Sequence, residues 1–537
     1  MRTSAGGATH LVVGLALVLF GGASLGCGDD NVLLEEKFHT HEKRIYSGAN
    51  VAPEELTADY WNSQAQETLK ARLGVKHNTN RAKNVIMFLG DGMSIPTLTA
   101  TRMVLGGEKE KLSFETFPYT GLSKTYCVDA QTADSACSAT AYLCGVKTND
   151  GTIGVTANVK RDDCEAMADE KNHVKSIAHW AQKAGKAAGF VTTTRVTHAS
   201  PAGTYANTAD RDWECDADIV KDGEDPKICP DIAEQLINHE PGKHFKVIMG
   251  GGRSYFRPKD ASDEEDGENF RLDGRDLIEQ WKLDKWTLGN FSYVWNKKQL
   301  DEVDGHNTDY LLGLFEPDHC KYHLDIVHDD EEDMEPSLSD MVDKAIDVLG
   351  RDENGFFLFV EGGKIDKAHH KTEPRKALDE TVEFSKAVLT ALSKTSTEDT
   401  LIVVTADHAH TMSMAGYPDR GNDIFGVSLD KAEDDLPMAT LTYANGPGYK
   451  KHVHKSGGRK NYLEAVDIND RDFKSPSVAP LSKETHGADD VAVFAVGPWA
   501  HLFTGNYEQN VIPHLMAYAA CVGEGAKMCD SGKVQPY

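Results

Sequence analysis

Six short apolar runs of β-forming residues recur along this chain, and helical patterns separate many of them. The runs are NVIMFL (84–89), GFVTTT (189–194), KVIMG (246–250), FFLFV (356–360), TLIVVT (400–405) and VAVFAV (491–496). Helical apolar spacing occupies residues 173–186, 337–350 and 374–395, each directly ahead of a run. Continuous apolar strands that alternate with helices are typical of a parallel sheet covered on both faces. We therefore expect an α/β fold with a large, mostly parallel central sheet.

Acidic side chains and histidines follow four of these runs, at the point where each predicted strand ends. They are Asp91, then His198 with Ser200, then Glu361, Asp366 and His370, and finally Asp407, His408 and His410. In open α/β sheets, ligands bind outside the carboxyl ends of the strands. One such motif alone is more often structural, but four strands that deliver these side chains to one edge indicate a common site.

The side chains at this edge have the chemistry of metal ligands. With the late His486, the candidates are Asp91, Glu361, Asp366, His370, Asp407, His408 and His486. Imidazole with carboxylate suits zinc, whereas carboxylates with a hydroxyl suit magnesium. The inventory is sufficient for two zinc ions and one magnesium ion. Two metals close together clamp the attacking and leaving oxygens of an in-line phosphoryl displacement.

A nucleophile for such chemistry occurs in ADSACSATAYLCG (133–145). Ser135 stands at the predicted start of a helix, where backbone N–H groups favour an anion. The alternative is that Asp134 and Ser135 only cap the helix, which both residue types favour. Arg211 offers a planar fork for two phosphate oxygens, although in isolation it is equally a surface arginine.

Composition limits the partners of the chain. Its 537 residues suit two to four domains, or one large α/β enzyme. Lys and Arg total 57 against 85 Asp and Glu, a net charge of −28, so we expect no nucleic-acid binding. An anionic substrate would need local positive charge, such as that of metal ions.

The N-terminus predicts export. Arg2 precedes the apolar run LVVGLALVLF (11–20) and small residues. The run is too short for the roughly 20 residues of a membrane span, which favours a signal peptide over residues 1–27 and no stable membrane span. Lipoprotein anchoring at Cys27 is the lesser alternative, and the C-terminus lacks a hydrophobic tail for a lipid anchor. We expect a secreted or periplasmic protein.

Ten cysteines in an exported chain predict disulfides. Cys127 with Cys137, Cys521 with Cys529, and Cys164 with Cys229 are candidate pairs, but spacing alone leaves the connectivity open. The chain lacks a CxxC motif, which argues against a cysteine-based zinc site.

Nine motifs, in order, closely resemble those of the alkaline phosphatases, especially the animal-type branch. They are FLGDGMS, DSACSATAYLCGVK, TTTRVTHASPAGTYAN, GGGR, GLFEP, FFLFVEGGKIDKAHH, TADHAHT, ANGPGY and ETHGADDVAVFAVGP. The resemblance runs from about residue 50 to residue 530. It implies a phosphomonoesterase with a phosphoserine intermediate, two zinc ions and one magnesium ion per subunit.

The resemblance assigns a role to each candidate. One zinc ion would take Asp366, His370 and His486; the other Asp407, His408 and the bridging Asp91; and magnesium Asp91, Ser200 and Glu361. Ser135 would be the nucleophile and Arg211 would clamp the phosphoryl group. His198 would lie near the magnesium waters, and His410 close to the metals without being a main ligand.

Three further features follow from the resemblance. A calcium site would use Phe315 through its carbonyl, Glu316 and Glu335, although solvation of an acidic loop explains these residues equally well. Lys367 stands where animal enzymes usually carry His, which affects the phosphate or magnesium-water contact, and Cys137 replaces a Gly.

The expected organisation is a catalytic domain with insertions. It comprises an extension (28–50), a dimerisation helix (51–75), a catalytic domain (80–416) with an acidic insertion around 257–335, a crown-like insertion (417–484) and a C-terminal part (485–537). In the family such a helix embraces a second subunit, and Tyr417 matches a tyrosine that reaches the partner's active site. We expect a homodimer; the alternative is a helix packed on its own chain.

Two rival functions differ from this interpretation. A phosphodiesterase or sulfatase of the same superfamily would share the fold, but DSACSA lacks the Pro and Arg of the sulfatase motif, and Ser200 with Glu361 favours a magnesium site. A secreted metal-binding protein without activity would not need Ser135 or Arg211.

Overall fold

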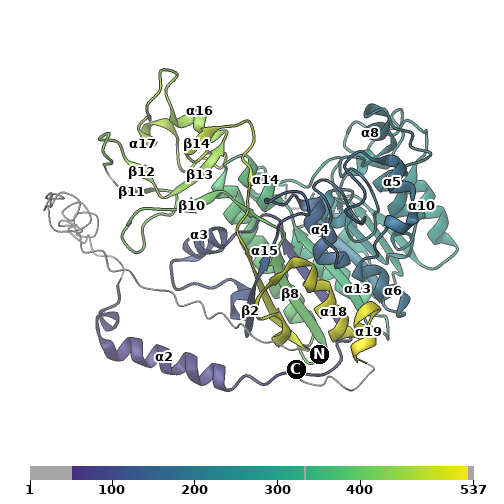
Figure 1. The fold of residues 1–537 in the computed structure, drawn as a ribbon, viewed down its shortest axis with the longest axis horizontal. Helices are drawn as coiled ribbons and strands as arrows, with labels where there is room; N and C mark the ends of the chain where they lie inside the picture. The colour runs from purple at the N-terminus through teal and green to yellow at the C-terminus, as the bar shows by residue number, and fades with distance from the viewer. Residues whose placement is uncertain (1–50, 332–333, 430, 530–537) are drawn as a thin grey trace, which may run out of the picture. The chain divides into compact units, whose positions relative to one another are not determined.

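A computed structural model of the chain describes residues 51–331, 334–429 and 431–529 (Figure 1). The predicted signal peptide (1–27) and extension (28–50) lie outside the described residues. None of the helices in the described ranges is long and apolar enough to cross a membrane.

A ten-stranded sheet forms the centre of the structure. Its order is β17 (Gly505–Glu508), β2 (Tyr119–Lys124), β16 (Val491–Val496), β8 (Thr400–Ala406), β1 (Asn84–Gly90), β7 (Phe356–Gly362), β3 (Ala187–Arg195), β4 (Val247–Gly251), β6 (Tyr310–Leu314) and β5 (Phe291–Val294). All neighbours pair in parallel except β16, which is antiparallel to β2 and β8. The predicted mostly parallel α/β sheet is confirmed, and each of the six apolar runs forms one of its strands.

The central strands are apolar along their length because both sheet faces are covered. In β1, Val85 and Met87 belong to one hydrophobic core and Ile86 and Phe88 to the other. Successive side chains of a strand point to opposite faces, so a run without polar residues fits only a doubly covered sheet.

Helices cover the two faces. One core contains buried side chains of α13 (Leu338–Leu349) and α15 (Pro374–Lys394), and the other those of α4 (Ser135–Cys144), α6 (Ile177–Lys183) and α18 (Ile512–Ala520). The helix α6 is shorter than the predicted 173–186, because the Ser176 hydroxyl accepts a hydrogen bond from the His179 N–H and starts the helix there.

The central strands end level with one another, and this alignment positions the site. Gly90, the last residue of β1, pairs with Gly362 of β7 and with Ala406 of β8. The residues that follow these three strands therefore enter the same edge of the sheet.

Residues 412–480 add a smaller lobe with its own sheet (Figure 1). The strands β10 (Met412–Met414), β13 (Leu441–Gly446) and β14 (Ser477–Pro480) form this sheet, beside the short helices α16 (Gly448–His452) and α17 (Tyr462–Ala465). Phe425, Leu441, Tyr443 and Phe473 are buried together in a separate core. This part of the chain is therefore a small packed lobe.

The helix α2 (Ala58–Leu73) follows a 3₁₀ turn, η1 (Pro53–Leu56), and buries none of its side chains in the described structure. Trp61, Leu69 and Leu73 are at least half exposed. A hydrogen bond from Lys109 Nζ to the Tyr60 hydroxyl at 2.9 Å links the start of α2 to the rest of the chain. Dimerisation through α2 therefore stays a prediction.

Three disulfides join Cys127 to Cys137, Cys164 to Cys229 and Cys521 to Cys529. All three candidate pairings are confirmed. Within the described ranges, Cys144, Cys215 and Cys320 are buried free thiols.

Candidate active site and metal centre

The candidate ligands lie just beyond the ends of β1, β7 and β8. Asp91 follows β1, Glu361 is the second-to-last residue of β7, and Asp407 follows β8. Asp366 and His370 come from α14 (Lys364–His370), which begins immediately after β7. These side chains are buried, except that of His370, which is 23% exposed.

Two glycines allow the close approach of these segments. A Cβ on Gly363 would lie 2.2 Å from the Thr194 side chain, and one on Gly92 would lie 2.3 Å from the His410 ring. Gly92 also has a positive φ of 65°, and its N–H donates to Asp407 Oδ1 at 2.9 Å. Larger residues at either position would displace the ligand-bearing loops.

Asp366, His370 and His486 form the first group. The Nε2 atoms of His370 and His486 lie 3.3 and 3.4 Å from Asp366 Oδ1, and 3.2 Å from each other. His370 Nδ1 donates to the Glu484 carbonyl at 2.6 Å, and His486 Nδ1 donates to the Ala133 carbonyl at 2.8 Å. Because these bonds place the ring proton on Nδ1, both Nε2 lone pairs face the carboxylate, as in a histidine metal site.

Asp91, Asp407 and His408 form the second group, beside Ser135. His408 Nε2 lies 3.1 Å from Asp407 Oδ2 and 3.5 Å from Asp91 Oδ1. The Ser135 hydroxyl is 3.3 Å from the same nitrogen. A cation bound by this group would therefore contact the serine oxygen.

Asp91, Ser200 and Glu361 make up the third, oxygen-rich group. Glu361 Oε2 accepts hydrogen bonds from the hydroxyls of Thr192 and Thr194. In the second and third groups, five buried oxygens lack a hydrogen-bond partner of normal geometry among the described residues: Asp91 Oδ1 and Oδ2, Ser200 Oγ, Glu361 Oε1 and Asp407 Oδ2. Buried polar atoms are rarely left unpaired, so this set fits divalent cations.

The protonation equilibria agree with a cation site. Burial, reinforced by Asp366 and Asp407, raises the pKa of Asp91 well above its usual range, and burial raises that of Glu361 to about 7. Burial lowers the pKa of His370 to about 4 and holds that of His408 well below its usual range. Neutral imidazoles beside carboxylates that lack counter-charge are what a bound metal requires.

His410 is held by two acids, and its ring also lies within a group of converging ligand atoms with Asp366, His408 and His486. Its Nε2 lies 2.7 Å from Asp366 Oδ1 and its Nδ1 2.6 Å from Glu484 Oε2. Burial opposes its charge, but Glu484 and Asp366 outweigh burial and raise its pKa to about 9. The sequence interpretation missed Glu484, whose contact with His410 spans 74 residues. Its place two residues before His486 was the one available signal.

Ser135 is the first residue of α4 and is buried. Asp134 caps the helix by accepting the Cys137 N–H at 3.0 Å, and its other oxygen accepts Arg211 Nη1 at 2.9 Å. The capping interpretation of Asp134 is therefore confirmed, and the role of Ser135 as a nucleophile stays a prediction. Asp134 also holds the guanidinium beside the serine, a role that the sequence analysis did not assign.

Arg211 and Lys367 converge on His198. Arg211 Nη2 and Lys367 Nζ each lie 3.2 Å from His198 Nε2. Burial and these two cations hold the pKa of His198 well below its usual range, so the imidazole is neutral and accepts from a donor. Lys367 also lies 3.4 Å from Asp366 Oδ2.

The remaining candidates lie apart from these three groups. Phe315 and Glu335 are buried, and Glu335 accepts the Lys321 backbone N–H at 2.9 Å. Burial raises the pKa of Glu316, and burial together with the neighbouring Glu316 raises that of Glu335 well above its usual range. Tyr417 is half exposed, on the segment after β10.

Solved structures share the fold. The alkaline phosphatase of Thermus thermophilus superposes with a TM-score of 0.58 at 22% identity, over 87% of this chain and 99% of that chain. The alkaline phosphatase from the Antarctic bacterium TAB5 gives a TM-score of 0.55 at 22% identity, over 83% of this chain and 100% of that chain.

Curated relatives are similar over nearly the whole length. The chain is 47% identical to the membrane-bound alkaline phosphatase of Bombyx mori, over 94% of this chain and 93% of that protein. It is also 47% identical to the tissue-nonspecific alkaline phosphatase of Homo sapiens, over 89% of this chain and 91% of that protein. The alkaline phosphatase family matches residues 82–522. This chain belongs to the alkaline phosphatase family.

Proposed function

We infer that this chain is a phosphomonoesterase that releases inorganic phosphate and an alcohol through a phosphoserine on Ser135. Family membership supports the activity. The single observation that carries the residue assignment is the position of Ser135 Oγ. It lies at a helix N-terminus, 3.3 Å from His408 Nε2, with Asp134 holding Arg211 alongside.

The proposed cofactors are two zinc ions and one magnesium ion. Asp366, His370 and His486 would hold one zinc ion, and Asp91, Asp407 and His408 the other; Asp91, Ser200 and Glu361 would hold magnesium. When bound, such cations lower the pKa of a serine hydroxyl and offset the charge of the phosphoryl group. The unpaired oxygens of Asp91, Ser200 and Glu361 support this assignment.

The proposed reaction consists of two successive displacements at phosphorus. Ser135 Oγ forms a bond to phosphorus while the ester P–O bond breaks, and the alcohol leaves with a proton. Water then attacks the same phosphorus, which releases phosphate and restores the serine hydroxyl. Two in-line inversions predict net retention of configuration. Arg211 binds two non-bridging oxygens through its planar fork, and Asp134 keeps that fork in place.

Lys367 and His198 form the outer wall of the phosphate position. Lys367 Nζ supplies a second cation 3.2 Å from His198 Nε2, which is itself within reach of Arg211. We propose that neutral His198 orients both cations and that Lys367 acts on bound phosphate as a point charge.

The assembly and location are also proposals. A homodimer formed through α2 is supported by Trp61, Leu69 and Leu73, which the described residues leave at least half exposed. Calcium at Phe315, Glu316 and Glu335 is supported by the raised pKa of the two carboxyls. Export is supported by residues 11–27 and by three disulfides. The lobe over 417–484 would be the crown-like insertion.

Hydrolysis of 4-nitrophenyl phosphate between pH 6 and 10 tests the activity. We expect alkaline-favoured turnover that is lost on chelation and returns only with zinc and magnesium. Ser135→Ala should lose turnover by at least about a thousandfold while its zinc and magnesium content stays the same. Nearly full turnover in Ser135→Ala would refute the phosphoserine. Cleavage of the corresponding diester or sulfate ester instead of the monoester would refute the substrate class.

A further inference from the structure

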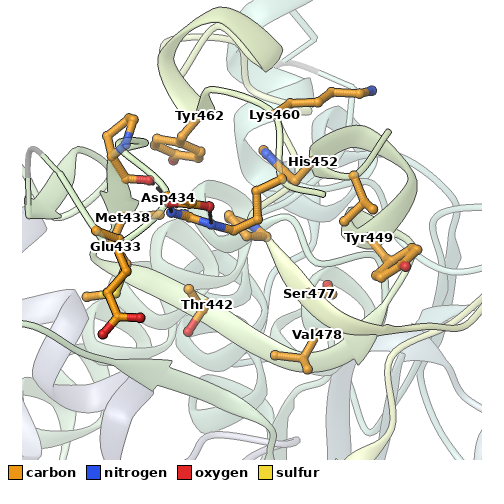
Figure 2. Close-up of a pocket in the computed structure, with 16 residues that line it drawn as sticks. Glu433, Asp434, Met438, Thr442, Tyr449, His452, Lys460, Tyr462, Ser477 and Val478 are labelled. Carbon is orange, nitrogen blue, oxygen red and sulfur yellow. Dashed lines mark hydrogen bonds and ion pairs between the residues drawn. The ribbon is translucent and has the colours of Figure 1, made fainter. Parts of the chain in front are cut away.

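A cavity of about 690 Å³ lies in the smaller lobe, among residues that take no part in the site described above (Figure 2). The strands β13 and β14 form its floor through Thr442, Ser477 and Val478, and Tyr449 and His452 of α16 line one side. This volume is typical of a site for a drug-sized molecule.

The walls of the cavity are largely apolar and aromatic. Pro437, Met438 and Val453 line it together with the rings of Tyr449 and Tyr462. The Tyr462 hydroxyl donates to the Phe425 carbonyl at 2.8 Å, so this residue offers its ring rather than its polar end. Flat aromatic walls favour a planar aromatic occupant.

Two buried polar atoms on the lining lack hydrogen-bond partners within the described ranges. They are His452 Nδ1 and Ser477 Oγ, on side chains that are only 5% and 6% exposed. His452 Nε2 donates to the Lys474 carbonyl at 2.6 Å, which leaves Nδ1 as an acceptor. Burial lowers the pKa of His452, consistent with this neutral form. A ligand hydroxyl would satisfy either atom.

The two cations around the cavity, Arg459 and Lys460, already have hydrogen-bond partners within the chain. Arg459 pairs with Asp434 through two hydrogen bonds of 2.5 and 2.9 Å, and its remaining donors reach the carbonyls of Leu436 and Pro437. Lys460 Nζ donates to the Lys451 carbonyl, and its side chain extends away from the cavity in Figure 2. Neither cation is therefore directed at a ligand in the cavity, and the exposed Glu433 on the lining also disfavours an anion, which distinguishes this cavity from the phosphate position.

We propose that this cavity is a second, non-catalytic binding site for an uncharged, planar aromatic molecule that carries hydroxyl groups. One hydroxyl donates to His452 Nδ1, a second contacts Ser477 Oγ, and the ring system lies against Tyr449 and Tyr462. The walls supply the affinity, and the two polar atoms supply the selectivity for hydroxyl groups.

The test uses 2,6-dihydroxynaphthalene, which is fluorescent and uncharged at neutral pH. Its binding to the whole metal-loaded protein is measured by fluorescence and calorimetry, with inorganic phosphate in excess to occupy the catalytic site. We expect one site per chain with a Kd of order 10–100 µM. The dimethyl ether, which cannot donate to His452, should bind at least about tenfold more weakly. Competition by phosphate, or equal affinity of the ether, would overturn the proposal.

Three variants locate the binding. Val478→Trp fills the mouth of the cavity from an exposed position and should abolish binding, whereas Ala479→Trp, one residue further along β14 and outside the lining, should not. Ser477→Ala removes a hydroxyl that has no partner in the described structure. It should weaken the diol several-fold without lowering the melting temperature. All three should retain turnover of 4-nitrophenyl phosphate. Undiminished binding to Val478→Trp, or absence of binding to the unmodified protein, would refute the site.

Discussion

Two clusters of carboxylates in this molecule are built on opposite principles. In the acidic insertion, Arg253 binds Asp263 and Glu265 at 2.6 Å, and Arg257 binds Glu264 at 2.6 Å. At the sheet edge, Asp91, Glu361 and Asp407 keep buried oxygens without a partner in the described ranges. Where the chain supplies its own cation, the carboxylates stabilise the fold. Where it does not, they leave a place for cations from solution.

Asp91→Asn should show the largest effect on activity. Asp91 contributes to two of the proposed metal positions, so we expect turnover to fall by more than the roughly hundredfold that outer-sphere partners of a metal cost. In chelated protein, by contrast, the substitution should stabilise the fold. Burial raises the pKa of Asp91 in the folded state, so its ionisation destabilises the metal-free fold progressively as pH rises above the unfolded pKa of about 3.8.

The measurement is the melting temperature of chelated protein against pH. The metal-free Asp91→Asn protein should be the more stable form, by a margin that widens from about pH 4 upward. A metal-free variant that is less stable than the unmodified chain at pH 7 would mean that Asp91 is a structural acid like Asp263.

Asp263→Asn tests the other cluster. The side chains of Asp263 and Arg253 are fully buried, and the substitution removes the one fully buried carboxylate that pairs with this guanidinium in the described structure. We expect a loss of about 3 kcal/mol in the free energy of unfolding by urea, with or without chelator. Turnover at temperatures below the unfolding transition should change little. If added metal changed this loss, the carboxylates of the acidic insertion would also bind cations, and the two clusters would not differ in the way described.

Glu335→Gln tests the intermediate case, in which Glu316 and Glu335 lie together with Lys321 as the nearby cation. The raised pKa of Glu335 means that the metal-free fold loses stability as pH rises above about 4.5, and Gln removes this penalty while it keeps an acceptor for the Lys321 N–H. At a hundredfold excess over Kd, calcium should stabilise the unmodified chain by about 2.7 kcal/mol, but not the variant. Equal calcium responses in thermal unfolding would exclude this position as the calcium site.

Glu55→Gln should have the smallest effect. Hydrogen bonds from Arg420 and Lys109 lower the pKa of Glu55 to about 2. The ionised Glu55 therefore attaches η1 to these two residues above about pH 4.5, and the stability that it contributes is lost as pH falls towards 2. The variant should show faster amide hydrogen exchange in residues 53–57 at pH 7, with unchanged global stability. Unchanged exchange would mean that the contact does not hold the turn.

The sequence by itself determined the sheet and most of the ligand set. Runs such as 84–89 and 400–405 can be buried only in a doubly covered sheet, and the residues after such parallel strands must meet at one edge. Asp91, Asp366 and Asp407 could therefore be assigned to one site from local patterns alone. The sequence was also sufficient for the start of α4, because the Asp134 side chain caps it by accepting the N–H of Cys137, three residues away.

Only the tertiary structure decided which acids are paired and which are not. Glu484 and Asp134 hold His410 and Arg211 across 74 and 77 residues, and no local pattern encodes such contacts. The local pattern of the acidic insertion assigns no basic partner to residues 263–265, yet Arg253 and Arg257 neutralise them. The aromatic cavity beside His452 likewise combines segments more than forty residues apart. The sequence shows that a residue is a carboxylic acid, but not whether a cation lies beside it. The neighbours that balance its charge come within hydrogen-bonding distance only when the chain folds.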